Sequence, residues 1–248
     1  MTKITQILRT LPLLVLAVAA NTAHASTIVA PNAYDATAGN VANNTAINSS
    51  ARTYEMQIAA SQLAGMAVGS SINGLAWRLA SNEPAASGVR NWSDFEITLG
   101  QAANTIAGMS TTFAANLLNP VLVRDGALSY DLSGFSNAGT PKPFAPSISF
   151  FTPYTYLGGD LVVLISHSIA TGGTNSFLDA LNTAAAGYGS DFKALSASTF
   201  NASTGNQQSF AITQFDFTTA STAVPEPEFM ALVGIGMLGL MARRRKLA

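Results

Sequence analysis

The 248-residue sequence contains no cysteine. This absence excludes disulfide bonds, thiol nucleophiles and thiolate metal ligands. The fold must therefore be held together by burial of apolar side chains and by hydrogen bonds.

Charged residues are also scarce, at 10% of the chain, and there are only two histidines. Six of the twelve basic residues and two of the thirteen acidic ones lie in two terminal segments described below. The body between them, residues 26–223, carries six basic and eleven acidic residues, a net charge of −5. Binding of nucleic acid or anionic lipid needs clustered cations, so we do not expect the body to bind either.

The N-terminus has the pattern of a secretory signal peptide over residues 1–25. Lys3 and Arg9 supply the positive charge, and residues 11–20 form an apolar stretch that is too short for a stable membrane span. Ala25 follows Ala23 at small-x-small spacing, which predicts cleavage between Ala25 and Ser26. We therefore expect the body to be exported.

The C-terminus combines a proline-rich turn, an apolar run and a basic end, over residues 224–248. The turn residues are Pro225, Glu226 and Pro227, the apolar run is residues 229–242, and the basic tail, residues 243–246, consists of Arg243, Arg244, Arg245 and Lys246. As a helix the run would be roughly 21 Å long, shorter than the bilayer core of about 30 Å, so it would span with local thinning. The alternative is a buried C-terminal helix of a soluble domain. The four cations favour a membrane anchor whose stop lies in the cytoplasm, the orientation that signal-peptide export also gives.

This C-terminal pattern resembles the PEP-CTERM sorting signal, with the family's motif on Pro225, Glu226 and Pro227. The resemblance implies export by a Gram-negative bacterium, transient holding in the inner membrane, and processing by an exosortase near this motif. It also implies an association with exopolysaccharide, and a final location at the cell surface or in the extracellular matrix. Glu228 departs from the small residue that commonly follows the motif, whereas Phe229 can serve as an aromatic residue at the membrane interface.

The body is expected to be mainly β, with residues 26–50 as an irregular leader that includes one edge strand and residues 51–223 as the domain. Two-residue alternation predicts strands around residues 54–58, 73–79, 95–99 and 210–217. Residues 160–167 are apolar on both faces, as in a central strand. Asp125-Gly126 predicts a hairpin between the runs 121–123 and 128–132, and residues 177–186 are compatible with one short helix.

Strands with regular turns, without strand–helix alternation, favour an antiparallel β-sandwich, jelly-roll-like, flanked by the signal peptide and a single C-terminal transmembrane helix. The stretches 72–78, 94–99 and 158–163 also resemble a group of PEP-CTERM proteins of unknown activity. That resemblance spans roughly residues 50–182 and implies no activity.

Catalytic candidates are few, and we expect the protein not to be an enzyme and to need no cofactor or metal. His167 ends an apolar strand, and its neighbours Ser166 and Ser168 point to opposite strand faces, so a Ser-His-Asp arrangement is not indicated. Asp94 and Glu96 share a strand face about 7 Å apart, a spacing open to a glycosidase pair or to two solvated carboxylates.

Three further aspartates follow or precede glycine turns, where calcium binding and turn formation are alternative roles. They are Asp125, Asp131 and Asp160. No calcium-loop motif accompanies them, so turn formation is the expected role.

Four aromatic residues are candidates for stacking on sugar rings. Trp77 shares the apolar phase of its strand and is expected in the core. Trp92 precedes a strand and is the better surface candidate, and Tyr154 and Tyr156 share one phase. Core packing is the alternative role of these residues and the one that we expect. The sequence thus leaves three roles for the body: a structural or adhesive domain, which we favour; a polysaccharide-binding module using Trp92, Tyr154 and Tyr156; and a glycan-active hydrolase.

Overall fold

A computed structural model describes residues 25–219, and within them every regular element is a β-strand or a short 3-10 helix. The predicted mainly-β class is confirmed, whereas the helix considered for residues 177–186 is wrong. That segment contains the strand β12 (Leu178–Leu181), whose four residues are all buried. The signal peptide up to residue 24 and the segment 224–248 lie outside the described residues.

The largest sheet has six antiparallel strands. Their order is β14 (Asn206–Gln208), β13 (Phe192–Ala197), β3 (Arg52–Ile58), β10 (Leu161–His167), β6 (Phe95–Ala102) and β7 (Leu117–Arg124). The predicted central strand is confirmed, because β10 pairs with β3 on one side and with β6 on the other. Its apolar residues on both faces, among them Leu161, Val162 and Val163, are fully buried.

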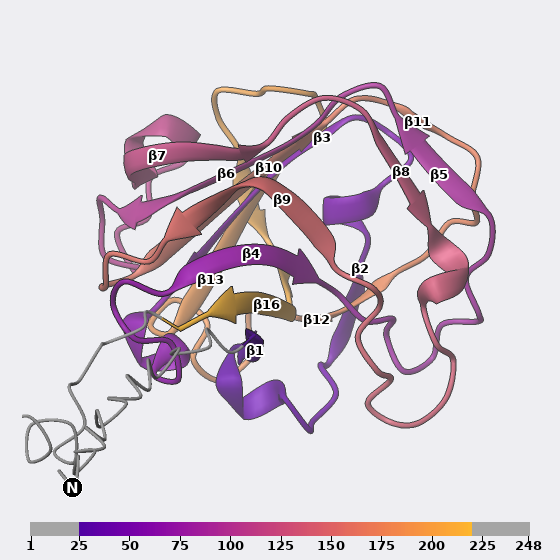
Figure 1. Ribbon diagram of the computed structural model, residues 1–248, viewed down its shortest axis with the longest axis horizontal. Coiled ribbons are helices and arrows are strands. Elements are labelled where there is room, and N and C mark those ends of the chain that lie inside the picture. The colour runs from indigo at the N-terminus through magenta and orange to yellow at the C-terminus, as the bar shows by residue number, and fades with distance from the viewer. Residues whose placement is uncertain (1–24, 220–248) are drawn as a thin grey trace, which may run out of the picture. The chain divides into compact units, whose positions relative to one another are not determined.

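A second sheet has four antiparallel strands. Their order is β1 (Ala25–Ala30), β16 (Thr213–Thr218), β4 (Ser71–Ala76) and β9 (Ile148–Thr155). The first and last strands of the described chain are therefore neighbours, and Figure 1 shows β16 beside β4 at one side of the molecule. At Gly74 a Cβ atom would lie 2.9 Å from the carbonyl oxygen of Ile148, so the bulged β4–β9 pairing requires glycine there.

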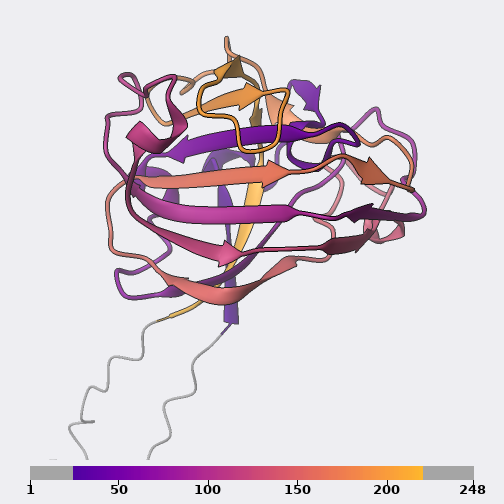
Figure 2. The same ribbon diagram turned by 90° about the horizontal axis from the view of Figure 1, so that it is seen from above.

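Three strands of the six-stranded sheet continue past a bend into a smaller sheet in the same order. The smaller sheet consists of β11 (Ala170–Thr171), β5 (Val89–Trp92) and β8 (Leu128–Asp131). Only two or three residues separate the two strands of each continuing pair, which are β10 and β11, β5 and β6, and β7 and β8. Figure 2 shows these strands running side by side through the bend. The predicted hairpin at Asp125-Gly126 is wrong, since β7 pairs with β6 and β8 with β5. The turn residues instead form part of the shared bend, where the Phe95 amide donates to the Gly126 carbonyl.

The segment expected as an irregular leader contributes to the core. Its edge strand is β1, and β2 (Val41–Asn43) joins a third small sheet with β12 and β15 (Phe210–Ala211). Ala46 and Ile47 in the 3-10 helix η2 (Thr45–Ile47) are buried in the same apolar cluster as the strands of both larger sheets. The core therefore begins well before residue 51. The other 3-10 helices are η1 (Asn32–Tyr34), η3 (Ala60–Leu63), η4 (Phe113–Asn116) and η5 (Leu132–Gly134).

Candidate functional site

The two ends of the described chain meet at one edge of the four-stranded sheet. Ala25 lies opposite Thr218 in the antiparallel β1–β16 pair. The predicted cleavage bond, Ala25–Ser26, is thus part of β1 itself. The sorting residues Pro225, Glu226 and Pro227, the apolar run 229–242, and the basic residues Arg243, Arg244, Arg245 and Lys246 lie outside the described residues. Within residues 25–219, no helix is long and apolar enough to span a membrane.

His167 is completely buried at the end of β10. Its ring stacks on Phe95 with 5.6 Å between centroids, and its Nδ1 and Nε2 lie 3.0 and 3.2 Å from the carbonyl oxygens of Ser168 and Thr45. Burial lowers the pKa of His167, and the two carbonyls only partly oppose this effect. Because both nitrogens face main-chain oxygens inside the protein, the imidazole is a packing group that no substrate reaches.

Trp92 is 2% exposed, so it has the core position that we expected and not the surface position that the alternative required. Its indole packs edge-on against Phe95 and His167, and its Nε1 donates to the Asn48 carbonyl at 3.2 Å. Trp92 is the last residue of β5, and the bend between the two sheets places its side chain against Phe95 and His167 instead of solvent. A glycan contact through Trp92 is excluded by this burial.

Tyr154 and Tyr156 are also buried, as is Trp77, for which a core position was predicted. The Tyr156 hydroxyl donates to the Gly159 carbonyl at 2.7 Å, and the Trp77 Nε1 donates to Thr213. Burial raises the pKa of both tyrosines, and in Tyr156 the nearby Asp160 adds to the effect. None of the residues proposed to stack on sugars presents a stacking face, because all three are packed in the core: Trp92, Tyr154 and Tyr156.

Asp94 and Glu96 lie where β6 passes the bend. Asp94 is exposed and accepts a hydrogen bond from Ser93, whereas Glu96 is half-buried on β6. Burial raises the pKa of Glu96, the Asn201 side chain opposes this, and the charges of Asp125 and Asp94 raise it further. The predicted pair thus consists of one exposed and one half-buried carboxylate on the same strand end.

The candidate calcium ligands have turn roles. Asp131 accepts hydrogen bonds from the amide and hydroxyl of Ser133 at the start of η5, and these bonds lower its pKa. Asp160 accepts from the Ala60 amide at 2.9 Å. In the described part of the chain, no group of three or more acidic or histidine side chains is arranged to hold a metal.

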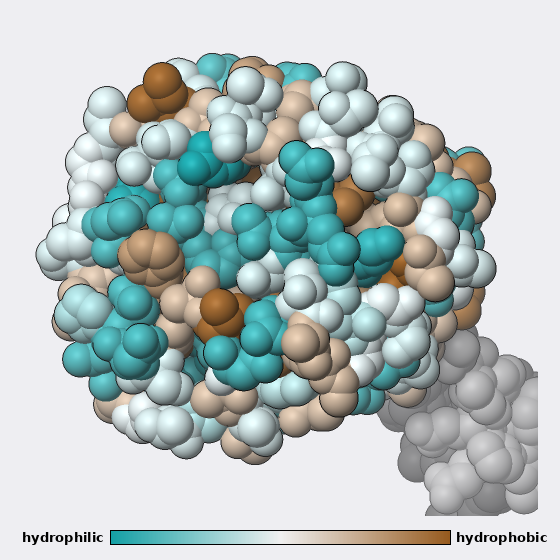
Figure 3. All heavy atoms as spheres, turned by 180° about the vertical axis from the view of Figure 1, so that it is seen from behind, coloured by the Kyte–Doolittle hydropathy of each residue, from teal (hydrophilic) through white to brown (hydrophobic). Residues whose placement is uncertain are grey.

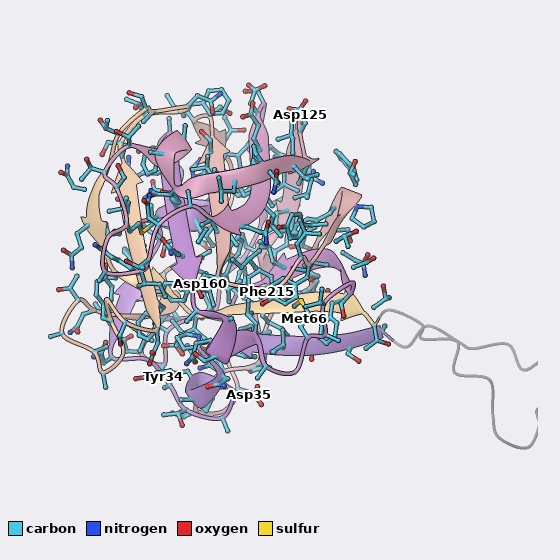
Figure 4. The ribbon with its side chains drawn as sticks, turned by 90° about the vertical axis from the view of Figure 1, so that its left-hand side faces the viewer. Tyr34, Asp35, Met66, Asp125, Asp160 and Phe215 are labelled. Atoms are coloured by element: carbon cyan, nitrogen blue, oxygen red, sulfur yellow. The ribbon has the colours of Figure 1, made fainter. Side chains whose placement is uncertain are left out.

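A buried ion pair of Arg78 and Asp179, which no sequence pattern indicated, lies beside the loop that follows β1. The Arg78 Nε lies 2.9 Å from Asp179 Oδ2, and the rest of the guanidinium donates to the carbonyls of Tyr34, Asp35 and Thr37. Figure 4 shows Tyr34 and Asp35 on this loop at the lower edge of the molecule. One arginine therefore fixes a loop 41 to 44 residues earlier in the chain.

A shallow cavity of about 250 Å³ with a mixed polar and apolar wall adjoins this ion pair. Its wall consists of residues 39–42 and 80–82 with Asp179. Because both carboxylate oxygens of Asp179 are already bonded, one to Arg78 and one to the Gly39 amide, the cavity offers no free charged group to a ligand.

A second buried polar cluster lies on the outer face of the six-stranded sheet. Glu55 on β3 is 0% exposed, and its Oε2 accepts from Asn116 Nδ2 at 2.7 Å, while its Oε1 has no partner. Gln57, two residues on, donates to the Asn104 carbonyl at 2.6 Å and leaves its own Oε1 unpartnered. Burial raises the pKa of Glu55 to about 8, against the smaller opposing effect of the Asn116 hydrogen bond.

In the sequence these residues appear only as the polar positions of an alternating strand, which predicts a solvent-exposed face. The segment 103–116 covers that face, together with a small apolar cluster of Met109, Phe113 and Leu195.

The C-terminal segment defines an exported protein with a C-terminal sorting signal. Residues 223–246 match the family model of the PEP-CTERM protein-sorting motif, so the chain carries the signal of an exosortase-sorted, membrane- or surface-associated protein. Comparison with curated proteins and with solved structures gave no significant match.

Proposed function

We propose that this chain is a surface or extracellular-matrix protein that an exosortase cleaves close to Pro225–Pro227, and that its body is structural or adhesive. The observation that carries the proposal is the sorting motif over residues 223–246. In this proposal the run 229–242 holds the chain in the inner membrane until processing, and residues 243–246 stop transfer at the cytoplasmic face.

The position of the chain ends supports this course of events. Ala25 and Thr218 are paired residues, so a signal peptide and a C-terminal anchor both attach at one edge of the body. The signal peptide and the C-terminal anchor can therefore enter the same membrane while the body stays folded, because their attachment points are adjacent.

We also propose that the body is not an enzyme and that its two larger sheets form a β-sandwich. The buried His167 and the polar partners of Asp131 and Asp160 support the first part. The second is supported by a single apolar cluster that contains Met56 and Ile165 of the six-stranded sheet with Leu75 and Phe215 of the four-stranded one. A jelly-roll-like connection of the strands stays a prediction.

The test is replacement of Pro225 and Pro227 by alanine in the native host, followed by intact mass and fractionation. The expected result is an inner-membrane form that keeps residues 229–248, because the exosortase no longer recognises its signal. A matched control replaces the exposed Pro84 and Pro143, which lie far from the motif in sequence. Normal release of the sorting variant would refute the proposal, and retention of both variants would point to a folding defect.

A further inference from the structure

Four strand ends lie level at the edge where the chain enters and leaves the body. Thr218 pairs with Ala25 on one side and with Ser71 on the other, and Ser71 pairs with Thr155. At this end of the sheet the first residues of β1 and β4 lie beside the last residues of β16 and β9.

Two loops extend the sheet beyond this edge and hold each other. The Gly69 amide donates to the Tyr156 carbonyl, and the Tyr156 amide donates to the Ser70 carbonyl, both at 2.8 Å. The loops present two apolar side chains to solvent: Val68 is 66% exposed and Leu157 is 47% exposed. Val68 packs against the loop that carries Leu157, since a Cβ on the adjacent Gly158 would lie 3.0 Å from Val68 Cγ2.

The same loops carry almost no charge. Residues 60–70 and 155–160 contain one ionisable acid, Asp160, and its Oδ1 is bonded to the Ala60 amide. Figure 4 shows both Asp160 and Met66 in the lower half of the view. By contrast, the face in Figure 3 is mainly hydrophilic with scattered apolar residues. The loops where the termini attach are thus mainly apolar and uncharged, with Asp160 and the neighbouring Asp191 as the acidic residues beside them, so they offer anionic headgroups less repulsion than the rest of this acidic protein.

The chain length between the body and the proposed anchor is short. From Thr218 to Phe229 is 11 residues, at most about 40 Å when fully extended and roughly 20 Å as a flexible coil. Such a tether keeps the end of the body at high effective concentration near the bilayer surface.

We propose that this end, formed by the loops 67–70 and 156–159, rests on the phospholipid bilayer while the C-terminal run is inserted. Val68 and Leu157 then lie at the boundary between headgroups and acyl chains, where exposed apolar side chains are favoured. The inference rests on the membrane-anchored intermediate of the proposed function. It orients the body so that the bend carrying β5, β8 and β11 points away from the membrane.

The absence of cysteine allows this orientation to be measured with single labels. Val68→Cys, Leu157→Cys and Ile169→Cys are each prepared in the mature chain with its C-terminal segment, and each is coupled to a polarity-sensitive fluorophore. Ile169 is the matched control: it is 71% exposed and lies just beyond the opposite end of β10, a strand about 20 Å long. The labelled chains are reconstituted into vesicles of phosphatidylethanolamine and phosphatidylglycerol that contain a lipid-borne quencher.

The expected result is severalfold stronger quenching at positions 68 and 157 than at position 169. Equal quenching at the three positions in chains that float with the vesicles would overturn the orientation and leave the anchor intact. Chains that fail to float would overturn the anchored intermediate itself, and the orientation with it. Stronger quenching at 169 would mean that the opposite end meets the bilayer.

Discussion

The buried carboxylate of Glu55 makes the stability of the body depend on pH in an unusual direction. Its folded-state pKa is about 8, above the ordinary value of 4.5 that applies to the unfolded chain. Between these values the folded body keeps a proton that the unfolded chain has lost. The free energy of unfolding therefore falls as pH rises, by about 1.4 kcal/mol per pH unit for this one group.

Across the whole window from pH 4.5 to 8, the loss amounts to about 5 kcal/mol as an upper bound, and to about 2.5 kcal/mol between pH 5 and pH 7. Glu55→Gln removes the ionisable group and keeps the shape and the acceptor for Asn116 Nδ2. We expect the variant to match the original protein at pH 5 within about 1 kcal/mol and to be more stable at pH 7 by about 2 kcal/mol.

The assay is urea denaturation of a fragment spanning residues 25–219 at pH 5, 6, 7 and 8. Glu83→Gln is the control, since it also changes one glutamate to its amide but sits in a half-buried turn. Only the difference between the two variants is attributed to Glu55. A Glu55→Gln protein that shows the same pH slope as the control, or that is less stable at pH 7, would refute the reasoning.

Two further predictions concern groups fixed by the core. Asp179→Ala should destabilise the body by about 3–5 kcal/mol, because it leaves the buried guanidinium of Arg78 without its counter-charge; urea denaturation should show this, and a loss below about 1 kcal/mol would contradict it. Trp92→Ala should cost about 3–5 kcal/mol through the cavity left against Phe95 and His167. An unchanged unfolding midpoint for that variant would show that the indole is not packed in the core.

Alternation and apolar runs predicted the strands well because burial acts directly on them. The run 160–167 predicts a central strand because it is apolar on both faces. The structure has β10 at that position, paired on both sides and buried on both faces. A local pattern does not encode which strand a turn will join. Asp125-Gly126 has the chemistry of a hairpin, but the three-strand bend gives β7 and β8 separate partners.

Exposure was the property that the sequence predicted least well. The polar phase of β3 predicts a solvent-exposed face, yet segment 103–116 covers Glu55 and Gln57 through hydrogen bonds to residues 61 and 47 positions away in sequence. Trp92 was the better surface candidate among the aromatic residues because it adjoins a turn, and the fold of the bend buries it. Long-range covering of this kind depends on tertiary packing, which overrides local propensity.

The distribution of charge explains why we do not expect the body to bind polyanions such as nucleic acid. Four of its six basic side chains are buried, and each bonds main-chain carbonyls: Arg78, Arg90, Arg124 and Lys142. Only two of the eleven acidic side chains, Glu55 and Asp179, are buried. The surface is therefore more acidic than the net charge of −5 indicates, with Arg52 and Lys193 as its cations among the described residues.

The strand order also constrains when export and folding can occur. If signal peptidase cleaves after Ala25, its scissile bond lies in β1, which is paired along its whole length with β16. A protease needs an extended, unpaired segment, so cleavage must precede this pairing. Because β16 is the last strand of the described chain to be made, β1 has no partner until the whole body has crossed the membrane. Closure of the four-stranded sheet is therefore a late step, which leaves the N-terminal cleavage bond accessible throughout export.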